Sequence, residues 1–122
     1  MKLREYKQPI FPCKFWVVLT EDLQDIKSKF YAGRHKEEIL DNWFEFSEII
    51  TFLGQGKSNK KYGVIVATED VKYLTVKNMA HEAVHVVGYL LEHIGEDEPG
   101  EEIRAYLTGW VVECLIDFKN KL

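Results

Sequence analysis

Apolar residues recur along this chain with two different periods, and the change of period predicts where strands and helices lie. Aromatic and β-branched residues are concentrated at residues 14–19, 49–53 and 62–68, which predicts three strands. Residues 54–61 are rich in Gly, Lys, Ser and Asn, which predicts a β-hairpin with a solvated turn between the last two strands. Residues 1–12 hold three basic residues, two prolines and little periodicity, so we expect an extended lead-in.

Helical spacing predicts four helices. The first begins near residues 20–22 and runs toward Gly33, and the second lies within residues 36–46. The third is capped by Thr75 or Asn78 and stops at Gly95, and the last runs from about residue 99 or 101 to Lys119. This order predicts an α+β fold in one domain spanning residues 1–122, with the helices packed on one face of a small sheet.

Composition and charge indicate which partners and which cellular compartment to expect for this chain. The net charge is −4 and the 16 basic residues are spread along the chain, so we expect no nucleic-acid partner. No segment approaches the roughly 18 apolar residues of a membrane span, and the apolar run near the amino terminus lacks the cleavage site of a signal peptide. Cys13 and Cys114 lack metal-ligand spacing and are expected to be buried thiols. We therefore expect a cytoplasmic protein with no membrane partner.

The segment His81-Glu82-Ala83-Val84-His85 lies on the third predicted helix and has the pattern H-E-x-x-H. Histidines four residues apart share one helical face, so both imidazoles can reach one zinc ion while the glutamate points toward its water. At about 100° per residue, these three polar residues fall within an arc of roughly 120° that also holds Tyr89 and His93. The simpler alternative is an amphipathic helix with two surface histidines and an exposed acid.

A hydrolytic zinc site usually has three protein ligands and one open position, so a third donor is needed. Glu102 is the preferred candidate, because it lies on the last helix and Ala105 on the next turn allows close approach to a neighbouring helix. Glu101 and His93 are alternatives. Acids in the first turn of a helix also complement its dipole without any metal. The other carboxylates considered lie in the preceding connector: Glu96, Asp97 and Glu98.

These residues resemble the gluzincin branch of the zincin metallopeptidases and, more narrowly, small zincin-like proteins encoded by bacteriophages and prophages. The resemblance covers roughly residues 68–112 and includes the pattern Glu102-x-x-Ala105-Tyr106-Leu107-x-Gly109-Trp110. It implies a minimal zincin-like domain, in which a small sheet with a hairpin packs against the motif helix and a C-terminal helix. It also implies that His81, His85 and Glu102 bind zinc, that Glu82 is the general base, and that a peptide lies along strand 62–68.

Two functions follow from this reasoning. The first is a zinc-dependent metallopeptidase, in which Glu82 takes a proton from zinc-activated water. Tyr106 is then a candidate donor to the oxyanion, with Tyr89 and His93 as alternatives. The second is a non-catalytic, zinc-stabilised protein-binding module of phage or prophage origin, since the chain lacks the second domain that closes the cleft of larger gluzincins. Glu82 favours the enzyme, because a purely structural zinc site has no use for a base.

Overall fold

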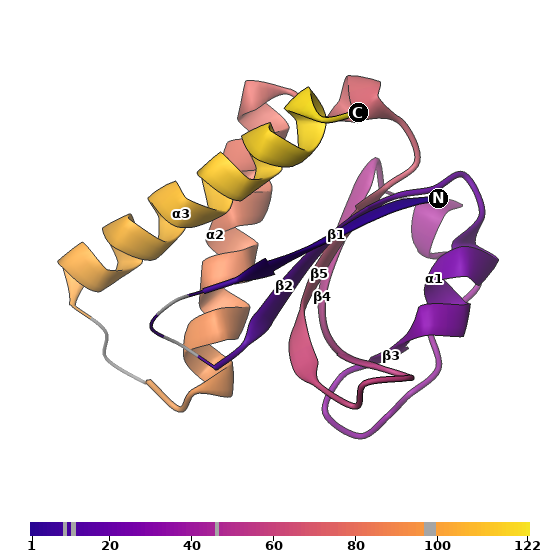
Figure 1. Ribbon diagram of the computed structural model, residues 1–122, viewed down its shortest axis with the longest axis horizontal. Coiled ribbons are helices and arrows are strands. Elements are labelled where there is room, and N and C mark those ends of the chain that lie inside the picture. Colours follow the sequence, from indigo (N-terminus) through magenta and orange to yellow (C-terminus); the bar gives the residue numbers. More distant parts are fainter. Residues whose placement is uncertain (9, 11, 46, 97–99) are drawn as a thin grey trace.

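A five-stranded mixed sheet forms the centre of the computed structural model, which describes residues 1–8, 10, 12–45, 47–96 and 100–122. The strand order is β1-β2-β5-β4-β3, and β2 and β5 are the only parallel neighbours in this sheet (Figure 1). The strands are β1 (Lys2–Lys7), β2 (Lys14–Leu19), β3 (Phe30–Ala32), β4 (Ile49–Gly56) and β5 (Tyr62–Thr68). The predicted hairpin of β4 and β5 is confirmed, as is the α+β fold class.

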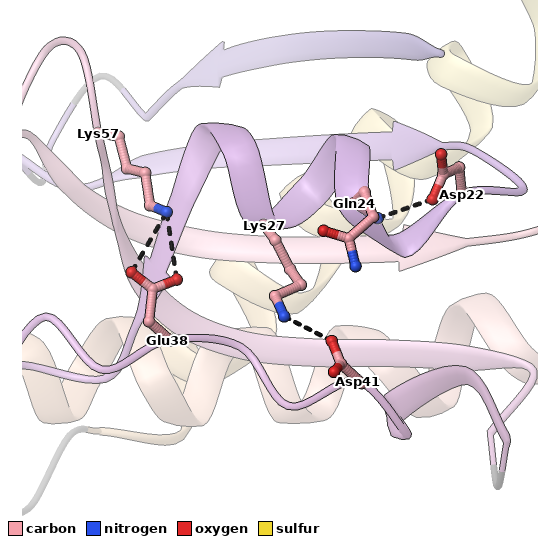
Figure 2. Close-up of polar contacts among 6 residues, drawn as sticks. All are labelled: Asp22, Gln24, Lys27, Glu38, Asp41 and Lys57. Atoms are coloured by element: carbon pink, nitrogen blue, oxygen red, sulfur yellow. Dashed lines mark hydrogen bonds and ion pairs between the residues drawn. The ribbon is translucent and has the colours of Figure 1, made fainter.

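Helices cover both faces of the sheet. The helices α2 (Val76–His93) and α3 (Glu101–Asn120) lie together on one face, and α1 (Leu23–Lys29) lies on the other (Figure 1). The prediction that all helices pack on one face is therefore wrong. Asp22 is the N-cap of α1 and accepts a hydrogen bond from the backbone N–H of Gln24 (Figure 2). Among the described residues, no helix is long and apolar enough to cross a membrane.

Alternating side chains of the central strands fill two separate cores. In β2, Phe15 and Val17 join the core beneath α2 and α3, whereas Trp16 and Val18 join the core beneath α1. The side chains of β5 alternate between the same two cores. Strands buried on both faces are almost continuously apolar, which is why β2 and β5 were recognisable from composition alone.

The first twelve residues are not a simple lead-in, because β1 pairs antiparallel with β2 at the edge of the sheet. Most of β1 is exposed, so its sequence lacks the apolar alternation of a half-buried strand. Side-chain hydrogen bonds attach it to the rest of the protein, including one of 3.3 Å from Lys14 Nζ to Glu5 Oε2. Trp16 Nε1 donates to Glu5 Oε1 at 3.0 Å, and the Tyr6 hydroxyl donates to Asp117 Oδ2 of α3 at 2.6 Å.

The prediction of a second helix within residues 36–46 is also wrong. Residues 36–45 contain turns and one short 3-10 helix, Trp43–Glu45, and residue 46 lies outside the described residues. Lys36 has a positive φ of 56°, which is incompatible with a continuing right-handed helix. Two ion pairs hold this segment: Lys27 of α1 pairs with Asp41 at 2.5 Å, and Lys57, which follows β4, pairs with Glu38 at 3.2 Å (Figure 2). The segment then passes beside β4.

The two long helices differ in how much of their length is packed. Thr75, and not Asn78, is the N-cap of α2, and Gly95 follows the helix with a φ of +75°. In α3, residues 101–106 are all exposed, and burial begins at Leu107. Figure 1 shows the start of α3 standing away from α2, with the two helices approaching each other farther along α3. The first turns of α3 therefore form no part of the core.

Candidate metal centre

The two motif histidines lie one turn apart on the exposed side of α2. Their Nε2 atoms are 3.2 Å apart, and their rings are tilted by 70° with centroids 4.9 Å apart. Two nitrogen ligands at about 2.05 Å from a tetrahedral zinc ion are about 3.3 Å apart. The pair therefore fits two positions of a zinc site. The same separation also suits an N–H···N hydrogen bond between neutral rings.

The histidines open into a groove of about 590 Å³ between α2, β4 and the segment that precedes β4. Glu82 is half-buried and lines the same groove. The wall opposite α2 includes Trp43, whose ring packs edge-on against Phe52 at a centroid distance of 4.9 Å. The remaining lining residues are Asn42, Ser47, Ile49, Ile50, Thr51 and Tyr89.

A threonine of β4 holds the motif glutamate. Thr51 Oγ1 donates a hydrogen bond of 2.5 Å to Glu82 Oε2, so the strand and the motif helix are joined within the groove. Sequence reasoning missed this residue, although a signal was present. Strand alternation places Thr51 on the same face as Ile49 and Leu53, which are buried against α2. A hydroxyl on an otherwise apolar face needs a polar partner.

The structure does not bring the predicted third ligand to the histidines. Glu102 lies in the exposed first turn of α3. Within the described ranges, no group of three His, Cys, Asp or Glu side chains is arranged to hold a metal. Glu101 is exposed on the same turn, whereas Asp97 and Glu98 lie outside the described residues. The candidate centre therefore offers two imidazoles to a metal, and the Glu82 carboxylate lines the same groove.

The candidate oxyanion donors are distributed differently from the prediction. Tyr106 lies on the exposed start of α3, with 51% of its surface accessible, and does not line the groove. Tyr89 lies one turn beyond His85 on α2 and does line it. His93 instead packs against Tyr62 with a centroid distance of 5.7 Å, and burial, followed by the charge of Arg34, lowers its pKa. Tyr89 is thus the tyrosine that the structure places beside the motif.

The cysteines contribute no metal ligand to this centre. Both are free and buried. Burial raises the pKa of Cys13 to about 11, and burial together with the nearby Asp117 and Glu113 carboxylates raises that of Cys114 to about 12. Since a metal-binding cysteine must be a thiolate, both thiols are poor ligands near neutral pH.

The prediction that a peptide lies along the edge of strand 62–68 is wrong in its placement, because β5 lies between β2 and β4. The sheet edge that borders the groove belongs to β4. On the outer side of β4, β3 pairs with Gly54, Gln55 and Gly56, and no other strand pairs on this side among the described residues. On this side the Leu53 carbonyl oxygen accepts a hydrogen bond from Gly33 N–H. Backbone groups of every second residue in a strand point to the same side, so those of Ile49 and Thr51 also face the outer side of β4. These two residues line the groove.

Comparisons with known proteins found no matching family model, no matching curated protein and no matching solved structure. The resemblance to zincins therefore depends on the motif residues and their arrangement in this chain.

Proposed function

We propose that this chain is a zinc-dependent metallopeptidase, in which His81 and His85 hold the metal and Glu82 is the general base. The observation that carries the proposal is the 3.2 Å separation of the two Nε2 atoms, beside a carboxylate that lines the same groove. Zinc bound there would lower the pKa of a water ligand toward neutrality and polarise a substrate carbonyl.

The residues of the chain supply the remaining chemistry. Glu82 accepts a proton from the water that attacks the peptide carbonyl, and later gives that proton to the leaving amine. The Tyr89 hydroxyl donates a hydrogen bond to the carbonyl oxygen as negative charge develops on it. The open edge of β4 offers the backbone groups of Ile49 and Thr51 to an extended peptide, which would bind as an added strand.

We also propose that Glu102 completes the ligand set, which requires the start of α3 to move toward α2. The exposure of residues 101–106 supports this step, since their movement uncovers no core residue. Isothermal titration calorimetry with zinc should show that Glu102→Gln weakens binding at least tenfold, whereas Glu101→Gln on the same turn leaves it unchanged. Unchanged affinity in Glu102→Gln would exclude Glu102 as a ligand.

Purified protein tests the enzymatic proposal directly. We expect elemental analysis to find zinc and a library of quenched fluorescent peptides to reveal cleavage. Glu82→Gln should retain zinc and lose cleavage by at least 10³-fold, because the amide cannot accept the water proton. Glu113→Gln, an exposed acid on α3, is the matched control and should cleave like the parent. A zinc-loaded parent protein that cleaves no peptide would contradict the proposal.

A second function is a zinc-stabilised binding module with no catalysis. One observation favours it: the start of α3 exposes Ile103 and Tyr106 by 42% and 51%. In this case zinc would raise the unfolding temperature, and neither the parent nor Glu82→Gln would cleave any peptide.

A further inference from the structure

We propose that Thr51 is a positioning residue that aligns the Glu82 carboxylate with a peptide bound along β4. This inference rests on the proposed peptidase function. Its direct evidence is the 2.5 Å hydrogen bond from Thr51 Oγ1 to Glu82 Oε2. A hydroxyl has one proton to donate, so the bond leaves Glu82 Oε1 as the oxygen that takes the water proton. Within the described chain, Oε1 has no hydrogen-bond donor of its own.

Packing does not explain a threonine at this position. Ile49 and Leu53, two residues away on either side and on the same face of β4, are both buried in the core beneath α2. Valine has nearly the shape of threonine and would suit this strand equally well. The only side-chain hydrogen bond of Thr51 goes to Glu82 within the part of the chain that the structure describes. The hydroxyl therefore acts on the glutamate and not on the strand.

The backbone of Thr51 gives the contact a second role. Its N–H and C=O lie on the open side of β4, where an added peptide strand would pair. A peptide that pairs there is held at a constant offset from the Thr51 side chain and hence from the carboxylate bound to it. Thr51 thus fixes both the register of the bound peptide and the position of the Glu82 carboxylate. This preorganisation lowers the entropy lost in reaching the transition state.

The proton balance assigns Thr51 no chemical step. The oxygen of the attacking water forms a bond to the carbonyl carbon as one of its O–H bonds breaks, and the released proton moves to Glu82 Oε1. The same proton then moves to the amide nitrogen as the C–N bond breaks, giving a carboxylic acid and an amine. Thr51 keeps its own proton throughout and remains the donor to Oε2.

Thr51→Val removes the hydroxyl and keeps the shape of the side chain. With the most rapidly cleaved peptide of the library, we expect kcat to fall about ten- to a hundredfold, the range expected for loss of a hydrogen bond to a charged group. KM and zinc affinity should stay within about twofold of the parent values. Thr51→Ser should restore most of kcat. Thr108→Val is the control, since its hydroxyl donates to the Arg104 carbonyl on α3. An unchanged kcat in Thr51→Val, or a loss confined to KM, would overturn the proposal.

A structural readout separates this inference from the peptidase proposal. Crystal structures of the parent and Thr51→Val should show the Glu82 carboxylate in one rotamer in the parent and displaced or spread over several in the variant. The same single rotamer in both proteins would overturn the positioning role even if peptides are cleaved. Conversely, a parent protein that cleaves nothing would contradict the peptidase function, while the comparison of rotamers still decides whether Thr51 positions the carboxylate.

Discussion

Zinc should stabilise the folded chain through the histidine pair, and His85→Ala should abolish that effect. At about 2.05 Å from zinc, two nitrogens 3.2 Å apart subtend an angle of about 103°, close to the tetrahedral value. The helix therefore needs little adjustment to bind the metal with both rings. An alanine at residue 85 leaves one imidazole, which cannot form this chelate.

The size of the effect follows from linkage. A ligand present at about a hundred times its Kd, and bound only by the folded state, stabilises that state by about 2.7 kcal/mol. For 122 residues, the entropy of unfolding near Tm is about 0.26 kcal/mol/K. Zinc at that excess should therefore raise Tm by about 10 °C in the parent, and by less than about 2 °C in His85→Ala.

Differential scanning fluorimetry with and without zinc measures both shifts. His35→Ala is the matched control, because this histidine is exposed in a turn outside the groove. The control should keep the full shift. If His85→Ala keeps it as well, zinc does not bind through the motif, and the geometric argument for the metal centre fails.

Two further predictions concern the sheet and its contact with α3. Gly63→Ala should lower the free energy of unfolding by about 1–3 kcal/mol in urea titrations, because a Cβ there would lie 2.4 Å from the Lys14 carbonyl oxygen of β2. The control Gly88→Ala, with no neighbour within 4 Å, should raise it by about 0.5–1 kcal/mol, and equal effects would contradict the close approach of the strands. Hydrogen bonds from Lys121, and next from Tyr6, lower the pKa of Asp117. The Asp117 carboxylate therefore stabilises the folded state at pH values above the unfolded pKa, near 4. This stabilisation is lost as the pH falls through the lower pKa of the folded state. Between pH 5 and pH 2, the urea midpoint of Asp117→Asn should fall less than that of the parent, and parallel curves would refute this coupling.

Much of the fold could be predicted because period and composition are strong in the buried elements. The strands β2, β4 and β5 and the helices α2 and α3 all have a clear apolar pattern. The failures occur where local pattern and tertiary context differ. The strand β1 is an exposed edge with few apolar residues. The helical spacing of residues 36–45 is overridden by the turn at residues 33–36, where Lys36 has a positive φ.

The candidate site divides in the same way. His81, Glu82 and His85 share one helix, so helical geometry alone predicts that they lie together. Their relation to other elements depends on how those elements pack. The start of α3 is unpacked, so Glu102 and Tyr106 do not join the histidines. The contact of Thr51 with Glu82 arises because β4 crosses beneath α2 in the core, which no local pattern specifies.

The parallel pairing of β2 with β5 has a consequence for how the chain folds. It joins Trp16 to Ile65 across almost fifty residues, and α1, β3 and β4 all lie within that loop. Closing a loop of this length lowers the entropy of the chain before the hydrogen bonds and packing of the paired strands form. The β4–β5 hairpin and the long helices contain local contacts and can form early, whereas the pairing of β2 with β5 requires contacts between distant parts of the chain. Completion of this long-range pairing is therefore the step that should limit the folding rate.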